Sequence, residues 1–67
     1  MDTIARVKEL AAERNISMHK LAQVCDVPYS TLKNTEQRCG QLTVDTIERI
    51  CIGLEITMST FFDEKGA

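Results

Sequence analysis

The chain is poor in aromatic residues, proline and glycine. Its 67 residues include no tryptophan, one tyrosine, two phenylalanines, one proline and three glycines. No run approaches the roughly 18 consecutive apolar residues of a membrane span, and the N-terminus lacks the basic and then apolar layout of a secretory signal. These absences argue against a membrane or secreted protein and predict a soluble, cytoplasmic one.

The sequence also offers little for metal binding or catalysis. Cys25, Cys39 and Cys51 are widely separated, and His19 is the only histidine, whereas a zinc site needs four ligands in close clusters. No paired carboxylates lie beside a histidine, and no glycine-rich phosphate loop is present. We therefore expect no metal, no cofactor and no enzymatic activity. Cys25 and Cys51 are expected to be buried; Cys39, beside Arg38 in a predicted loop, leaves a redox role open.

A hydrophobic fraction of 43% nevertheless suits a folded globule. A chain this short buries only about 60% of its unfolded surface, so we expect one marginally stable domain that spans residues 1–67. Alternating strand patterns are absent, and apolar residues recur at helical spacing. The sequence predicts an all-α fold of five short helices.

Two helices are predicted in residues 2–26. Asp2 or Thr3 suits the N-cap of the first helix, and Asn15 suits the left-handed residue that closes it. Ser17 suits the N-cap of the second helix, and Asp26 tolerates the left-handed turn that follows. The side chains expected to face the core are Ile4, Val7, Leu10, Ala11, Leu21, Ala22, Val24 and Cys25.

Three helices are predicted in the rest of the chain. Pro28 favours a helix start, so the third is expected over residues 28–36 with Leu32 as its main apolar anchor, and a loop over residues 37–42 follows. Thr43 and Thr57 suit the N-caps of the fourth and fifth helices. The inward residues expected in the fourth helix are Val44, Ile47, Ile50, Cys51 and Leu54.

The fifth predicted helix carries Met58, Phe61 and Phe62. Adjacent residues on a helix point about 100° apart, so Phe61 and Phe62 cannot both face inward. Either one joins the core while the other lies at a dimer seam, or both are half-buried within one chain.

Residues 17–37 have the spacing of two helices that meet at a tight turn. A crossing angle of roughly 90–120° needs a small residue where the helices approach, and Ala22 supplies it. One small shared core would contain Leu21, Cys25, Val27 and Leu32. The side chains left facing outward are Tyr29, Ser30, Lys33, Asn34 and Gln37.

Residues 4–62 resemble the phage-repressor and Cro-like helix-turn-helix family, also called the XRE type. The matching stretches are ISMHKLAQVCDVPYSTLKNTE and, after a loop, TVDTIERICIGLEITMSTFF. The resemblance implies a compact five-helix lambda-repressor-like domain that binds double-stranded DNA, with the 28–36 helix in the major groove. The base contacts that it implies are Tyr29, Ser30, Thr31, Lys33 and Asn34. The phosphate contacts that it implies are Ser17, Met18, His19, Lys20, Arg38, Gly40, Gln41 and Thr43.

Several positions depart from the family pattern. Met18 stands where the family often has glutamine, Asp26 where the turn has glycine, and Thr35 where a larger apolar residue is usual. Glu36 matches an acidic residue that pairs with an arginine of the first helix, but the matching position here is Ala11. These departures bear on affinity and sequence preference more than on fold.

The charge balance is unusual for a DNA-binding protein. The net charge is −2, although residues 17–42 hold three basic and two acidic residues, or +1, and the remainder holds five and eight, or −3. The acidic excess outside the motif includes Glu48, Glu55, Asp63 and Glu64. One copy should bind DNA weakly, and a dimer on two half-sites would compensate.

The sequence thus predicts a transcriptional regulator, a repressor that binds a palindromic operator as a homodimer. The resemblance alone implies a bacterial or phage-like origin. The alternative is a protein-binding module of the same fold, in which the 28–36 helix or the Phe61–Phe62 end docks a toxin or another regulator.

Overall fold

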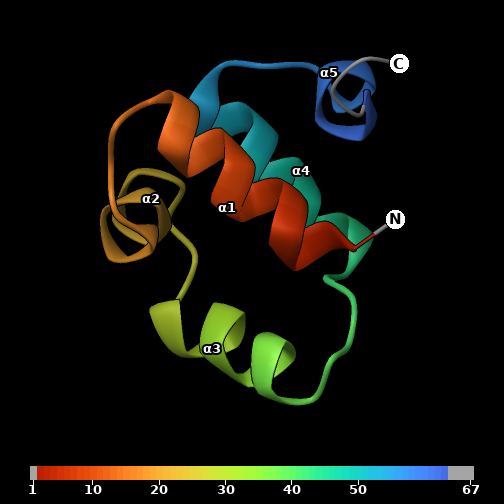
Figure 1. Cartoon of the computed structure of the whole chain (residues 1–67). Coiled ribbons are helices and arrows are strands. Elements are labelled where there is room, and N and C mark those ends of the chain that lie inside the picture. Colours follow the sequence, from red (N-terminus) through yellow and green to blue (C-terminus); the bar gives the residue numbers. More distant parts are fainter. Residues whose placement is uncertain (1, 64–67) are drawn as a thin grey trace.

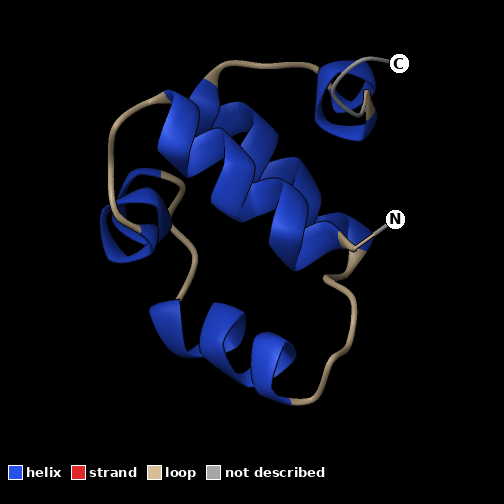
Figure 2. Ribbon diagram, in the orientation of Figure 1, coloured by secondary structure: helices blue, strands red, loops and turns tan. Residues whose placement is uncertain are grey.

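The computed structural model describes residues 2–63, which form five helices and no strands (Figure 1). The helices are α1 Thr3–Glu13, α2 Met18–Val24, α3 Tyr29–Gln37, α4 Val44–Leu54 and α5 Met58–Phe62. Figure 2 shows that short loops join them. The predicted all-α, five-helix fold is therefore confirmed. Met1 and residues 64–67 of the expected domain, Glu64 among them, lie outside the described residues.

Four of the helices begin at a side-chain cap. The oxygen atoms of these caps accept hydrogen bonds from backbone N–H groups of the first turn, and the capping residues are Asp2, Ser17, Thr43 and Thr57. Ser17, Thr43 and Thr57 were expected from the sequence, and Asp2 was one of two alternatives, with Thr3. The helix α3 instead follows Pro28, which has no side-chain cap bond. It begins and ends one residue later than predicted, so Gln37 belongs to the helix and not to the loop.

Each of the helices α1 to α4 is followed, within two residues of its end, by a left-handed residue that is not glycine. After α2, Asp26 has φ 57°, and the N–H of Val27 donates to the carbonyl of Ala22 at 2.9 Å. The same closing pattern follows the other three helices, with left-handed residues Asn15, Cys39 and Glu55. A side chain in this conformation costs roughly 1–2 kcal/mol relative to glycine. Asn15 and Asp26 were predicted in this role, and Cys39 and Glu55 were not.

One hydrophobic cluster connects the helices. Its largest fully buried side chains are Phe61, Leu21, Leu32, Ile50 and Val7, and Cys25, Val27 and Cys51 belong to the same cluster. The helix pairs that pack against each other are α1 with α2 and α3, α2 with α3 and α4, and α4 with α5. Within the described part of the chain, no helix has the length and hydrophobicity to cross a bilayer.

The prediction that Val24 and Val44 face the core is wrong. They are exposed by 46% and 69%. At 100° per residue, Val24 points about 110° away from the centre of the face that Leu21, Ala22 and Cys25 bury. Val44 is the first residue of α4 and points about 70° away from that helix's buried stripe. In both helices the buried face is narrower than the apolar content alone suggests.

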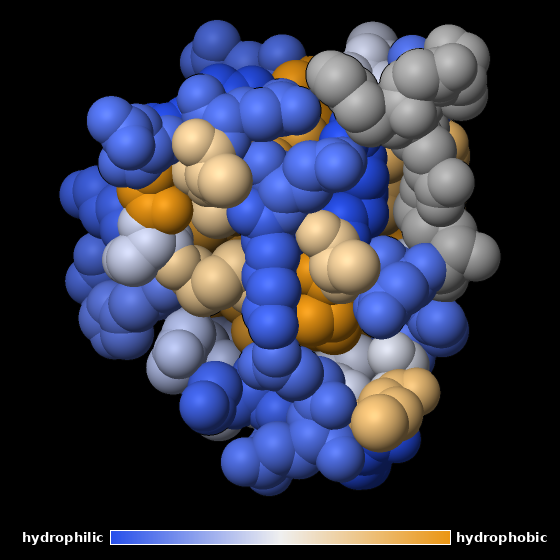
Figure 3. Space-filling view, viewed as in Figure 1, coloured by the Kyte–Doolittle hydropathy of each residue, from blue (hydrophilic) through white to orange (hydrophobic). Residues whose placement is uncertain are grey.

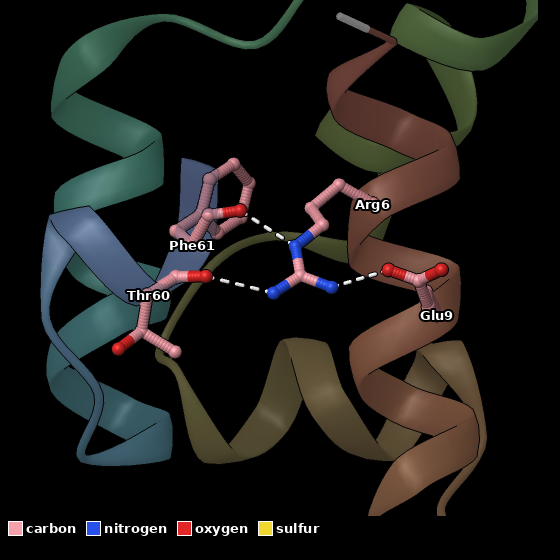
Figure 4. Close-up of polar contacts among 4 residues, drawn as sticks. All are labelled: Arg6, Glu9, Thr60 and Phe61. Carbon is pink, nitrogen blue, oxygen red and sulfur yellow. Dashed lines mark hydrogen bonds and ion pairs between the residues drawn. The ribbon is translucent and has the colours of Figure 1, made fainter. Parts of the chain in front are cut away.

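Two arginines, Arg6 in α1 and Arg14 at its C-cap, bind carbonyls at the C-terminal ends of two other helices. The Nε and Nη2 atoms of Arg6 donate to the carbonyls of Phe61 and Thr60 at 2.6 and 2.7 Å, and its Nη1 pairs with Glu9 (Figure 4). Arg14 donates to the carbonyl of Leu54 at the end of α4 at 2.8 Å. Because a helix C-terminus carries partial negative charge and unpaired carbonyls, both cations are well placed.

Candidate nucleic-acid interface

The helix α3 is attached to the molecule by two buried side chains. Leu32 is 2% exposed and Thr35 is 3% exposed, and they lie three residues apart on one side of the helix. Leu32 was the expected anchor. The burial of Thr35, which stands where the family usually has a larger apolar residue, was not predicted. The rest of α3 is free to carry polar side chains.

The opposite side of α3 faces solvent. The predicted outward residues are all exposed, and they are Tyr29, Ser30, Lys33, Asn34 and Gln37. Thr31 is half-buried. In Figure 3 the lower part of the molecule, where α3 lies in Figure 1, is mostly hydrophilic on the face shown. The structure therefore brings together, on one helix, the five residues that the resemblance assigns to base contacts.

The turn between α2 and α3 fixes the angle at which α3 is presented. Ala22 is 2% exposed where the helices approach, and Val27 is 6% exposed within the turn. Asp26 takes the left-handed conformation, and Pro28 has φ −60° and ψ 130°. A turn that is anchored by the buried Val27 and has constrained dihedral angles holds the exposed helix in one orientation.

The start of α2 contributes a second exposed cluster beside α3. The Oγ of Ser17 accepts from the N–H of Lys20 at 3.0 Å, and Met18 is half-buried against the core. His19 and Lys20 are exposed. The ring of His19 lies 5.1 Å from that of Tyr29, centroid to centroid, at an interplanar angle of 59°. This contact joins the first turns of α2 and α3 and was not expected from the sequence.

The connection from α3 to α4 is tied down by its own hydrogen bonds. The Oε1 of Gln41 accepts from the N–H and the hydroxyl of Thr3 at 2.9 and 2.8 Å, and the N–H of Leu42 donates to the Thr3 hydroxyl at 2.8 Å. The N–H of Gly40 donates to the carbonyl of Thr35 at 3.0 Å. These bonds leave the Nε2 of Gln41 as the part of that side chain able to reach outward.

Two other candidate phosphate contacts lie at the ends of this connection. Arg38 is exposed at the C-cap of α3. The Oγ1 of Thr43 caps α4 by accepting from the N–H of Thr46 at 3.2 Å. Among these residues, Arg38 has the side chain best suited to a phosphate, because it is charged and reaches into solvent.

An ion pair between α1 and α3 supplies the missing partner of Glu36. The Nζ of Lys8 pairs with the Oε2 of Glu36, so the partner is Lys8 and not the residue at the family's position, Ala11. The hydrogen bond and the charge of Glu36 raise the pKa of Lys8 above its ordinary value. The pair is exposed, with side-chain exposures of 51% and 41%, and such pairs contribute little to stability. Its main effect is to offset an acidic charge beside the polar face of α3.

The charge near α3 is more favourable than the sequence suggested. With Glu36 paired, Asp26 is the acidic residue in the 17–42 segment that has no ion pair within residues 2–63. Asp26 lines a shallow pocket together with Arg49 of α4. Lys20, Lys33 and Arg38 are exposed.

Two of the three cysteines belong to the core and one lies at the surface. Cys25 and Cys51 are buried, as expected, and burial raises the pKa of both thiols. The Sγ of Cys25 donates to the carbonyl of Ile50 at 3.5 Å. Cys39 is exposed. Among residues 2–63, no three or more His, Cys, Asp or Glu side chains gather closely enough to hold a metal ion.

Comparison with known proteins places this architecture in a family. A family model described as the Cro/C1-type HTH DNA-binding domain matches residues 6–64. No curated protein and no solved structure matches the chain. The matched region covers most of the sequence and includes both helices of the motif, α2 and α3. The chain therefore belongs to the Cro/C1-type helix-turn-helix DNA-binding family.

Proposed function

We propose that this protein is a sequence-specific regulator that binds double-stranded DNA with α3 in the major groove. The main observation in support of the proposal is the exposed polar face of α3. The buried side chains of Leu32 and Thr35 attach the other side of this helix to the core. A major groove about 12 Å wide admits one helix and displays a distinct set of donors and acceptors for each base pair. Family membership favours DNA binding over catalysis.

The exposed residues of α3 have chemistry that suits base edges. The amide of Asn34 can pair with adenine through two hydrogen bonds, and the ammonium of Lys33 can donate to O6 and N7 of guanine. Ser30 can donate or accept, and Tyr29 offers a hydroxyl and an apolar ring for a thymine methyl group. Thr31, half-buried, reaches either a base or a phosphate.

Phosphate contacts on both sides of α3 would set its register on the duplex. On one side the candidates are Ser17, Met18, His19 and Lys20, of which Met18 is half-buried and the other three are exposed. On the other side they are Arg38, Gly40, Gln41 and Thr43. Since Gly40 and Thr43 are engaged in the chain's own hydrogen bonds, Arg38 and the Nε2 of Gln41 are the stronger candidates.

We further propose that the protein binds as a homodimer and represses transcription by occupying a palindromic operator. Residues 17–42 carry a charge of +1 from sequence, too little for tight binding by one copy because affinity grows with the number of phosphates neutralised. Two copies on half-sites about one helical turn apart would combine their contacts. Phe62, exposed by 45% beside the buried Phe61, is the candidate for the seam.

Selection of bound duplexes from a random pool tests this proposal directly. A palindromic consensus would support sequence-specific binding by a dimer and would give the half-site spacing. Enrichment of a sequence without symmetry would support binding by one copy and contradict the dimer. No enrichment at low salt, where phosphate contacts are strongest, would contradict the DNA-binding function.

A second candidate function is the docking of a partner protein. It is favoured by exposed apolar side chains away from α3, Ile52 at 72% and Val24 at 46%, which line one shallow pocket together with Arg49. Titration with random duplex at low salt separates the two functions. Absence of binding at about tens of micromolar, within the usual range for non-specific DNA binding, favours protein docking.

A further inference from the structure

The ring contact between His19 and Tyr29 links the two helices of the motif on their exposed side. His19 is the second residue of α2 and Tyr29 is the first residue of α3. Their centroids are 5.1 Å apart at 59°, within the 4.5–7 Å separation typical of interacting aromatic rings. Tyr29 keeps 37% of its surface exposed, so the contact restrains the ring without hiding it.

The backbone beneath these two rings is fixed by the core. Ala22 and Val27 are buried, and the N–H of Val27 donates to the carbonyl of Ala22 at 2.9 Å. The left-handed Asp26 and the constrained Pro28 complete the turn. The relative position of the Cα atoms of His19 and Tyr29 is thereby set. The Tyr29 ring can then move only by rotation about its side-chain torsions. A neighbouring ring that favours one rotamer removes part of that freedom before any ligand is bound.

We infer that His19 is a positioning residue for Tyr29 and so determines how selectively Tyr29 reads one base pair. The inference rests on the proposed DNA-binding function and deepens it. The family often places glutamine at the first position of the second helix, where this chain has the half-buried Met18; here the next residue, His19, touches the helix that reads the bases.

This role differs in its consequences from a phosphate contact by His19. Loss of a phosphate contact weakens binding to every duplex by a similar factor. Loss of a positioning contact instead reduces the preference for one base pair, because a free ring contacts right and wrong bases alike. The two roles can therefore be separated by measuring discrimination rather than affinity.

The experiment compares the wild type with His19→Ala, His19→Phe, Tyr29→Ala and the double variant His19→Ala, Tyr29→Ala. Discrimination is the ratio of Kd values for the duplex selected from the random pool and for duplexes changed at one base pair. Tyr29→Ala identifies the base pair concerned. His19→Ala should lower discrimination at that same base pair by about two- to tenfold, the range of an aromatic pair. His19→Phe should retain it, and the double variant should lose no more than Tyr29→Ala.

Three results would overturn the inference. The first is that His19→Ala weakens all duplexes equally; the second is that it leaves discrimination unchanged; the third is that Tyr29→Ala affects no single base pair. The NMR spectrum of the free protein is an independent check, since Tyr29→Ala should shift the ring protons of His19 and an unshifted spectrum contradicts the contact. Failure of the wild type to bind any duplex would overturn the proposed function itself and is recognised without any variant.

Discussion

The helices α1 and α3 have similar lengths but are held in the molecule in different ways. α1 buries six of its eleven residues, whereas α3 buries two of nine. Polar side chains of α1 and of its C-cap bind within the chain: Arg6 binds α5, Lys8 binds α3, and the C-cap residue Arg14 binds α4. On α3, Lys33 makes no ion pair to any residue in the described part of the chain.

The difference shows that the two helices use their side chains differently. A short protein has little apolar surface to bury, and α1 uses its surface to connect the other helices. Few side chains of α3 pack in the core, and Ser30, Lys33 and Asn34 remain exposed. A polar, exposed helix that is nevertheless held rigidly by its neighbours is the arrangement expected of a surface that contacts a polar ligand.

Leu32→Ala should have the largest effect, because Leu32 is the main apolar attachment of α3. Truncation of a buried leucine costs about 2–5 kcal/mol. Urea unfolding followed by circular dichroism measures the loss, and the neighbouring exposed Lys33→Ala, expected within about 0.5 kcal/mol, is the control. Similar losses in both variants would show that α3 is not held as described.

Arg6→Met should have the next largest effect on stability, and it tests whether α1 holds another helix in place. The change removes the donors to the carbonyls of Phe61 and Thr60. The Thr60 carbonyl keeps the N–H of Asp63 as a donor, but the buried Phe61 carbonyl loses its side-chain donor, and a buried acceptor left unpaired costs about 1–3 kcal/mol. The matched control is Arg49→Met, since the guanidinium of Arg49 is exposed and lies 4.0 Å from Asp45. If the two substitutions shift the unfolding midpoint equally, Arg6 does not hold α5.

On the α3 side, Asn34→Ala should weaken binding to the selected duplex by about 1–3 kcal/mol and relax preference at one base pair. Arg38→Ala should weaken all duplexes alike and reduce the slope of log Kd against log salt by about one. Fluorescence titrations at several salt concentrations separate these effects. Equal effects of both changes on every sequence would remove the base-reading role of Asn34.

A stabilising change is expected at the turn between the two helices. Asp26→Gly should raise stability by about 1 kcal/mol, because glycine adopts the left-handed conformation without a side-chain clash. The melting temperature measures the gain, and Gln23→Gly within α2 is the control, expected to lose about 1 kcal/mol. A lower melting temperature for Asp26→Gly would contradict the conformation of the turn.

The smallest effect is expected from Lys8→Ala, since exposed ion pairs contribute little. Because Glu36 raises the pKa of Lys8, the contribution of the pair is fully present below the ordinary lysine pKa and is lost as pH rises through the raised value. At pH 7 the urea midpoint should match that of the wild type. A clear loss would mean that α1 holds α3 more firmly than the exposure of the pair suggests.

Local features of the fold could be predicted from the sequence. The N-caps at Ser17, Thr43 and Thr57 and the left-handed turn at Asp26 depend on groups within a few residues of one another, so residue type and spacing suffice. The outward face of α3 could also be predicted, because the apolar anchor Leu32 sets the rotation of the helix about its own axis.

Features that depend on the packing of distant segments could not be predicted. The partners of Arg6 and Lys8 lie up to 55 and 28 positions away, and no sequence pattern names them. Cys39 and Glu55 take left-handed conformations that their residue types disfavour. The contact of His19 with Tyr29 depends on the angle between α2 and α3, which only the packed turn defines.

Chemical-shift mapping of the labelled protein with the selected duplex tests the central claim most directly. The account predicts that the backbone amides of residues 29–34, with those of His19 and Lys20, show the largest shifts, and that amides around Ile52 on the exposed side of α4 stay in place. Large shifts confined to α4 and α5, with the amides of α3 unmoved, would contradict it.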